Sequence, residues 1–383
     1  MNAVTRAGLP LPRGEREARM AWSRITEPER SQAAVALIDE YGAEEAFARV
    51  AAGRVEGADR LQPRLAALDL ERDLHVLVRI GARVLIPGDD EWPSGLDDLA
   101  VPPHCLWVRG PLHAGEACQR SVAVVGARSA TSYGETTASD LAAGLCDRGF
   151  TVVSGAAFGI DAAAHRGALA VDGSTIAVLA GGVERPYPVA HRQLIDRIAE
   201  VGLVVSEVPP GSAPTKHRFL SRNRIIATAT QGTLVVEAGL RSGSLSTANR
   251  ALQHHRVVAA VPGPVTSMVS AGCHEYIRDR GAILVTDAAE AAEAVGQLGR
   301  DLAPAKRGPE KTGDDLDDAE AMVLAALPVR RPASVATLVL QTTLGDRELV
   351  ACLGRLEVRR LAQRDGQGWR KTTARRAGVG GGA

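Results

Sequence analysis

The feature that most constrains the fold is a series of short apolar segments between residues 120 and 287. Each has the length of a β-strand, and helix-length stretches separate them. The segments are apolar at almost every position, which is typical of parallel strands covered on both faces. The sequence therefore predicts a doubly wound, extended Rossmann-like α/β domain with a mostly parallel sheet. The segments are SVAVVGA, FTVVSGAA, STIAVLAGG, VGLVVSEV, GTLVVEA, RVVAAVPG and GAILVTD.

The sequence on either side of these segments divides the chain further. Residues 1–81 predict a small all-helical domain, because apolar residues recur there at three- and four-residue spacing. The Rossmann-like domain is then expected over 82–299, and a linker rich in Pro, Gly and charge over 300–315. Residues 316–373 predict short helices followed by a hairpin, the order of a winged-helix module. Residues 374–383 predict a frayed tail.

Composition excludes several classes of protein. The 45 basic and 45 acidic side chains of the 383 residues cancel, so net charge argues for neither a nucleic acid nor a membrane partner. Near the N-terminus no apolar segment resembles a signal peptide, and no apolar run reaches the ~18 residues of a membrane helix. We therefore expect a cytoplasmic protein without membrane insertion. The five cysteines form no C-x-x-C pair, which predicts reduced thiols and no metal site.

Glycine-rich turns follow four of the predicted strands. In a parallel sheet these turns lie at one edge, where helix N-termini expose unpaired amide groups that can bind phosphate. Four such turns in one sheet therefore predict a phosphate-binding rim. The residues that form it are Gly126 and Arg128; Ser154, Gly155 and Gly159; Gly181 and Gly182; and Ser242, Gly243 and Ser244.

Known nucleotide-binding motifs are missing from these turns. The segment VVGARSATSYG lacks the G-x-G-x-x-G spacing of dinucleotide-binding folds, and the Walker A lysine pattern does not occur. The sequence therefore predicts no cofactor.

Local charge points to nucleic acid. Residues 211–260 contain seven basic residues and one acid. Within them, the segment KHRFLSRNR places Lys216, Arg222 and Arg224 around one aromatic residue, Phe219. Cations that follow a phosphate backbone and an aromatic ring on which a base stacks are what single-stranded nucleic acid requires. The alternative is that the arginines cap helices or pair with acids, and that Phe219 belongs to the core.

Three other titratable residues are interpreted as supporting the site. Asp161 and His165 lie four residues apart and so share a helix face, but no G-x-S-x-G motif accompanies them. We therefore interpret Asp161 as an anchor at a helix N-terminus and His165 as a packing residue, and predict no catalytic residue. Glu237 ends an apolar strand, where an unpaired carboxylate is costly, and its expected partner is an arginine of the segment 222–224.

These motifs, in this order, resemble those of the DNA-processing protein A family (DprA, also called Smf). The resemblance covers about residues 86–287. It rests on VAVVGAR (122–128), SGAAFGIDAAAH (154–165), TIAVLAGGVERPYP (175–188), Ser206 with Glu207, FLSRNRII (219–226), LVVEAGLRSGSLSTA (234–248) and AVPGPV (260–265).

The resemblance implies an extended Rossmann fold that binds single-stranded DNA, forms a homodimer and helps to load the RecA recombinase during natural transformation. The family is not known for catalysis. By position, Arg128 and Lys216 would bind phosphate and Phe219 would flank them. Arg222, Asn223 and Arg224 form the family's R-N-R motif, whose arginines bind phosphate or brace Glu237. The resemblance also implies a SAM-like or helix-hairpin-helix-like N-terminal domain and a winged C-terminal module.

The sequence departs from the family pattern at three positions. Ala127 stands where Ser or Thr is common, Leu220 stands where Pro is usual, and Val189 stands where many members have a basic residue. The missing charge at Val189 removes a potential DNA contact, for which Arg192 could substitute.

Two other functions remain open at this stage. One is an enzyme similar to the cytokinin-activating phosphoribohydrolases, which use a Gly-rich turn and a glutamate near a ribose phosphate. The Gly181–Gly182 turn and Glu237 favour it, whereas its P-G-G-x-G-T-x-x-E motif is absent. The other is a regulator that binds duplex DNA through the winged module.

Overall fold

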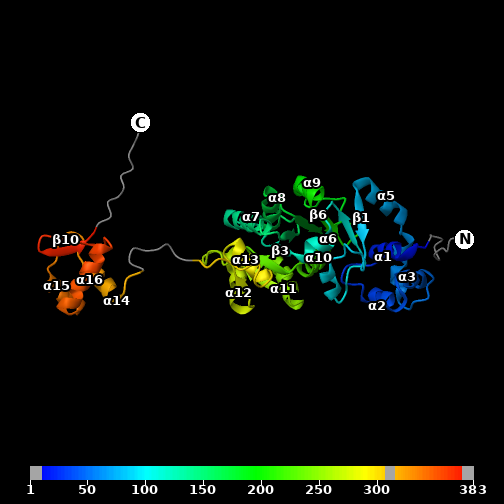
Figure 1. Ribbon diagram of the computed structural model, residues 1–383. Helices are drawn as coiled ribbons and strands as arrows, with labels where there is room; N and C mark the ends of the chain where they lie inside the picture. Colours follow the sequence, from blue (N-terminus) through cyan, green and yellow to red (C-terminus); the bar gives the residue numbers. More distant parts are fainter. Residues whose placement is uncertain (1–10, 307–314, 373–383) are drawn as a thin grey trace, which may run out of the picture. The chain divides into compact units, whose positions relative to one another are not determined.

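The structure is a computed structural model that describes residues 11–306 and 315–372 (Figure 1). The chain forms two compact units, Met1–Pro304 and Ala305–Ala383. Much of the predicted linker, 307–314, and the predicted tail, 374–383, lie outside the described residues. The domain boundaries predicted within the first unit stay predictions.

A nine-stranded sheet forms the centre of the first unit, with strand order β1-β2-β6-β5-β4-β3-β7-β8-β9. All pairs from β6 to β9 are parallel, and β1 and β2 are antiparallel additions beside β6. The predicted α/β class with a mostly parallel sheet is therefore confirmed. Each of the seven apolar segments contains a strand, whereas β1 and β2 were not predicted. The strands are β1 (Ala82–Leu85), β2 (Leu106–Arg109), β3 (Ser121–Val125), β4 (Thr151–Ser154), β5 (Thr175–Leu179), β6 (Leu203–Ser206), β7 (Gly232–Val235), β8 (Val257–Ala260) and β9 (Ile283–Leu284).

Helices cover both faces of this sheet, which explains why its strands are apolar throughout. In β3, Val122 and Val124 pack against α7, α8 and α13, whereas Ala123 and Val125 belong to the core formed with α10, α11 and α12. The helices of this region are α6 (Ala114–Gln119), α7 (Ser132–Cys146), α8 (Ile160–Ala170), α9 (Arg192–Val201), α10 (Lys216–Thr228), α11 (Ser244–Gln253), α12 (Ala271–Asp279) and α13 (Ala288–Val295).

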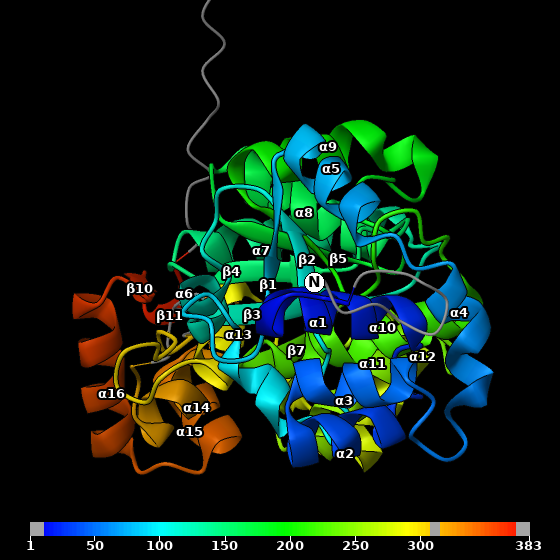
Figure 2. The same ribbon diagram turned by 90° about the vertical axis from the view of Figure 1, so that its right-hand side faces the viewer.

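The described part of the N-terminal segment is helical. Its helices surround a core of their own, in which Trp22 and Phe47 meet edge to face with ring centroids 5.7 Å apart. Figures 1 and 2 show these helices, in blue, at the end of the sheet that carries β1. A SAM-like or helix-hairpin-helix-like identity stays a prediction. The helices are α1 (Gly14–Ile25), α2 (Gln32–Tyr41), α3 (Ala43–Ala51), α4 (Gln62–Ala66) and α5 (Leu70–Ile80), with a short 3-10 helix, η1 (Ala58–Leu61).

The second unit has the order helix, helix, helix, hairpin. Its core includes Leu338, Leu349 and Leu353, and the strands of the hairpin pair antiparallel. Its identity as a winged helix stays a prediction. Across both units, none of the described helices combines the length and the apolar character needed to span a bilayer. The elements are α14 (Asp318–Ala326), α15 (Val335–Thr342), α16 (Asp346–Val358), β10 (Ala362–Asp365) and β11 (Gly368–Lys371).

Candidate functional site

A pocket of about 860 Å³ lies where the strand order reverses, at the carboxyl ends of β3 and β7. Ligands of open α/β sheets bind at such switch points. The turn after β3 (126–129), the loop 239–244 and one face of α10 form its walls. We call it the α10 pocket.

Helix α10 turns one face to this pocket and the opposite face to the N-terminal helices. Its first residues are held by Thr215, whose hydroxyl accepts a hydrogen bond from the Arg218 amide at 3.3 Å. Lys216, Phe219 and Asn223 lie three or four residues apart, so they share the face that lines the pocket. Asn223 also donates to the carbonyl of Gly243 at 3.4 Å, which ties the helix to the loop 239–244.

Cations and aromatic rings meet at the mouth of the pocket. The Arg128 guanidinium carbon lies 4.8 Å from the centroid of the Phe219 ring, within the range of a cation–π contact. The Tyr187 ring also contacts Phe219. The centroids of the two rings are 5.7 Å apart, and their planes meet at 55°. Arg128 and Lys216 are exposed, and Phe219 is half-buried. The mouth therefore offers positive charge and ring faces to the solvent.

The floor of the pocket contains a buried cation, Arg222, which is 6% exposed. Its Nη1 donates to the carbonyl of Val178, and its Nε has no hydrogen-bond partner within the described chain. A Cβ atom at Gly155 would lie 1.8 Å from this guanidinium, so the glycine makes room for it. Burial lowers the pKa of Arg222 to about 10, which Asp161 opposes. Arg222 therefore stays charged at neutral pH.

Comparisons with known proteins identify the family to which the chain belongs. A family model described as DNA recombination-mediator protein A matches residues 83–296. A putative DNA processing protein DprA of Mycobacterium tuberculosis is 46% identical over 368 residues, which cover 91% of this chain and 93% of the relative. The chain belongs to the DprA family.

Two solved DprA structures resemble the chain. DNA processing protein A from Streptococcus pneumoniae aligns with a TM-score of 0.62 and 31% identity, over 75% of this chain and 100% of that chain. DNA processing protein A from Helicobacter pylori, described for its single-stranded DNA binding mode, aligns with a TM-score of 0.50 and 27% identity, over 55% and 94%. The predicted membership of the DprA family is thus confirmed.

The structure brings together most of the residues that the DprA motifs predict. Ser154, Gly155, Gly159 and Arg224 do not line the α10 pocket. Ser154 is buried and donates to the Val124 carbonyl at 2.6 Å. Gly159 has a φ of 73°, which favours glycine, at the start of α8. The predicted residues that line the pocket are Gly126, Arg128, Asp161, Lys216, Phe219, Arg222, Asn223, Ser242, Gly243 and Ser244.

The expected pairing of Glu237 with an R-N-R arginine is not found. Both Glu237 oxygens accept hydrogen bonds from Thr131, one from its amide and one from its hydroxyl, each at 2.8 Å. Arg224 instead forms an ion pair with Glu207 and donates to the Val101 carbonyl. The reason is helical geometry: Arg224 follows Arg222 by two residues, about 200° around the axis, so it faces away from the pocket.

Asp161 and His165 both lie on α8, and of the two only Asp161 lines the pocket. The Asp161 carboxylate accepts from the amides of Gly155 at 3.2 Å and Ala157 at 3.4 Å, and burial raises its pKa although Arg222 lies nearby. His165 is fully buried, its Nδ1 is 2.7 Å from the Thr175 hydroxyl, and burial lowers its pKa to about 3. Asp161 therefore fixes the turn that precedes α8.

One of the four glycine-rich turns is closed. The Glu184 side chain occupies the turn at Gly181–Gly182, where its Oε1 accepts from the Gly211 amide at 2.7 Å. A carboxylate there repels phosphate, so the turns after β3, β4 and β7 are the three of the four that still contribute to the pocket.

Among the lining residues that were not assigned from the sequence, one is a cation and one is aromatic. Arg241 is exposed in the loop 239–244, and Tyr187 reaches the pocket from the turn after β5. The basic count over 211–260 included Arg241, so charge alone could have indicated it. The position of Tyr187 at the pocket could not be predicted from the sequence, because its contact with Phe219 joins distant parts of the chain.

Proposed function

We propose that this DprA-family protein binds single-stranded DNA in the α10 pocket. The observation that carries the proposal is the arrangement of Arg128, Lys216 and Arg241 around the Phe219 and Tyr187 rings, above the buried Arg222. Cations contact the phosphates, and the rings provide surfaces on which bases stack without regard to sequence. The relative from Helicobacter pylori, described for its single-stranded DNA binding mode, supports the same ligand.

The proposal extends to the role of the bound strand. Following the family resemblance, we propose that the protein acts in the cytoplasm as a recombination mediator. It protects incoming DNA and helps to load the RecA recombinase during natural transformation. It does so as a homodimer. The edge strand β9 supports self-association, because Ile283 and Leu284 leave half of their apolar surface exposed beside unpaired backbone groups.

The phosphoribohydrolase alternative has less support from the site. Such an enzyme needs a carboxylate near the ribose, and Glu237 is 1% exposed with both oxygens bound by Thr131. The DprA family is one of DNA-processing proteins, and we propose no catalytic activity.

Titration with a labelled oligonucleotide, single-stranded and then duplexed, at several salt concentrations tests the proposal. We expect a preference for the single strand and an affinity that falls with salt. Arg128→Ala should make the logarithmic salt slope less steep by about 0.7, the value of one single-strand phosphate contact. Equal binding of duplex and single strand, or an unchanged slope in the Arg128 variant, would contradict the proposal.

A further inference from the structure

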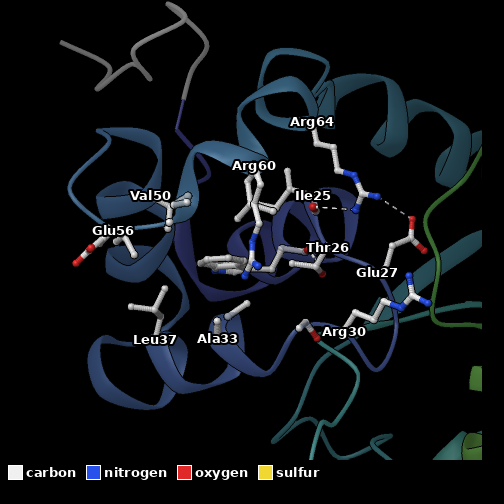
Figure 3. A pocket seen from close by; sticks show the side chains of 17 residues that line it. Ile25, Thr26, Glu27, Arg30, Ala33, Leu37, Val50, Glu56, Arg60 and Arg64 are labelled. Carbon is white, nitrogen blue, oxygen red and sulfur yellow. Dashed lines mark hydrogen bonds and ion pairs between the residues drawn. The ribbon is translucent and has the colours of Figure 1, made fainter.

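The N-terminal helices enclose a second pocket, of about 320 Å³, which the proposed function does not use. We call it the N-terminal pocket. Its apolar lining includes Ile25, Leu37 and Val50, contributed by α1, α2 and α3 (Figure 3). The segment 57–64 closes it from the other side. The pocket is thus a recess of mixed polar and apolar surface, within a segment that lies beside α10.

Unpaired positive charge lines this recess. Arg30 and Arg60 are exposed, and neither side chain has a hydrogen bond or ion pair with any described residue. In Figure 3 the Arg60 side chain extends into the pocket. Arg64 pairs with Glu27 at 3.1 Å, and Glu27 also accepts from Arg218 at 2.9 Å, so two arginines share that one carboxylate. The guanidinium groups of Arg30 and Arg60 therefore remain free to bind an anion, and the exposed Glu56 carboxylate lines the pocket with them.

Helix α10 connects the two pockets. Lys216 lines the α10 pocket, whereas the neighbouring His217 and Arg218 turn to the N-terminal segment. His217 Nε2 lies 3.0 Å from the Pro28 carbonyl oxygen, and Arg218 contacts Glu27, which lines the N-terminal pocket. Helix α10 thus places Lys216 at the α10 pocket and, on its other side, His217 and Arg218 against the segment that forms the N-terminal pocket.

We propose that the N-terminal pocket is a second subsite for the strand that occupies the α10 pocket, and that it takes one nucleotide. This inference rests on the proposed function. The base lies against the apolar lining, and its phosphate binds Arg30 and Arg60. Guanidinium groups suit both parts of a nucleotide, because they pair with phosphate and stack on flat rings. Basic grooves that follow the backbone are the general means by which folds hold single strands.

The test compares short and long oligonucleotides. A thymidine oligonucleotide of about 5 nucleotides, near the smallest site size of single-strand binding folds, should fill only the α10 pocket, whereas one of about 20 should reach both pockets. For the long strand, Arg60→Ala and Arg30→Ala should each make the logarithmic salt slope less steep by about 0.7. Binding of the short strand should stay unchanged. Arg60→Gln removes the charge but keeps most of the side chain, and should act like Arg60→Ala.

Arg54→Ala is the matched control, because Arg54 is an exposed arginine of the same segment that does not line the pocket. It should leave both strands unaffected. Slopes for the long strand that do not change in the Arg30 and Arg60 variants, while Arg128→Ala reduces them, would overturn this subsite and leave the proposed function standing. Equal losses for short and long strands would also overturn it. Failure of the unmodified protein to bind either strand would refute the proposed function itself.

Discussion

At the scale of single residues, the mouth of the α10 pocket is organised by the contact between Arg128 and Phe219. The guanidinium lies over the ring, so the half-buried Phe219 orients an exposed cation that would otherwise sample many rotamers. A side chain that is already ordered loses less conformational entropy when it binds phosphate. In the proposed function Phe219 therefore has two roles, as a stacking surface and as a support for Arg128.

This coupling predicts that substitutions at the two positions are not additive. Phe219→Leu should weaken single-strand binding by about 1 to 3 kcal/mol in the unmodified protein, the usual value of a base–aromatic stack. In the Arg128→Ala background the loss should be smaller by at least about 0.5 kcal/mol, because the support has no cation left to orient. A double-mutant cycle of dissociation constants at fixed salt measures the difference. Fully additive losses would show that Phe219 acts without Arg128.

At the scale of elements, α10 joins the proposed DNA site to the rest of the fold. The face that carries Lys216 and Phe219 lines the pocket, and the opposite face carries Arg218 and Arg224 into ion pairs with Glu27 and Glu207. The segment KHRFLSRNR therefore divides its cations between ligand and structure. The burial of Arg224 is compatible with its charge because it meets the Glu207 carboxylate.

Arg224→Ala should consequently affect stability and not binding. Arg224 is 1% exposed, and removal of one partner of a buried ion pair costs about 3 to 5 kcal/mol, because Glu207 is left unpaired. Urea denaturation measures the loss, and oligonucleotide titration of the folded fraction should give the affinity of the unmodified protein. The double variant Arg224→Met with Glu207→Gln should recover part of the stability, since it removes both charges. A weaker affinity with normal stability would make Arg224 a DNA contact.

The sequence was sufficient to predict the central strands. It was insufficient to predict the side-chain contacts that form when these strands pair. Strands β3 to β8 were predictable because burial on both faces favours apolar residues at almost every position. The exposed edge strand β9 was predictable because Ile283 and Leu284 continue the same apolar pattern. Strands β1 and β2 were missed, because each carries an arginine, Arg83 or Arg109, and so lacks the uninterrupted apolar run of the central strands. The partner of Glu237 could not be predicted, since Thr131 lies 106 residues away and meets it only when β3 and β7 pair.

At the scale of the whole molecule, the proposed functions belong to one unit. The α10 pocket and the N-terminal pocket both lie within Met1–Pro304, and the second unit has its own core around Val323, Leu338 and Leu353. On α16 of that unit, Arg355 and Arg359 pair with acidic residues, including Glu320. These two arginines are thereby less available to phosphate.

Truncation after Pro304 tests this division of labour. The shortened chain keeps every residue that lines either pocket, so it should fold and bind a single strand of about 20 nucleotides with an affinity within about twofold of the full chain, a difference of roughly 0.4 kcal/mol. Arg128→Ala should reduce the salt slope equally in both lengths. A large loss of affinity on truncation, with the melting temperature of the first unit unchanged, would show that the second unit binds DNA directly. A lower melting temperature would instead show that the two units stabilise each other.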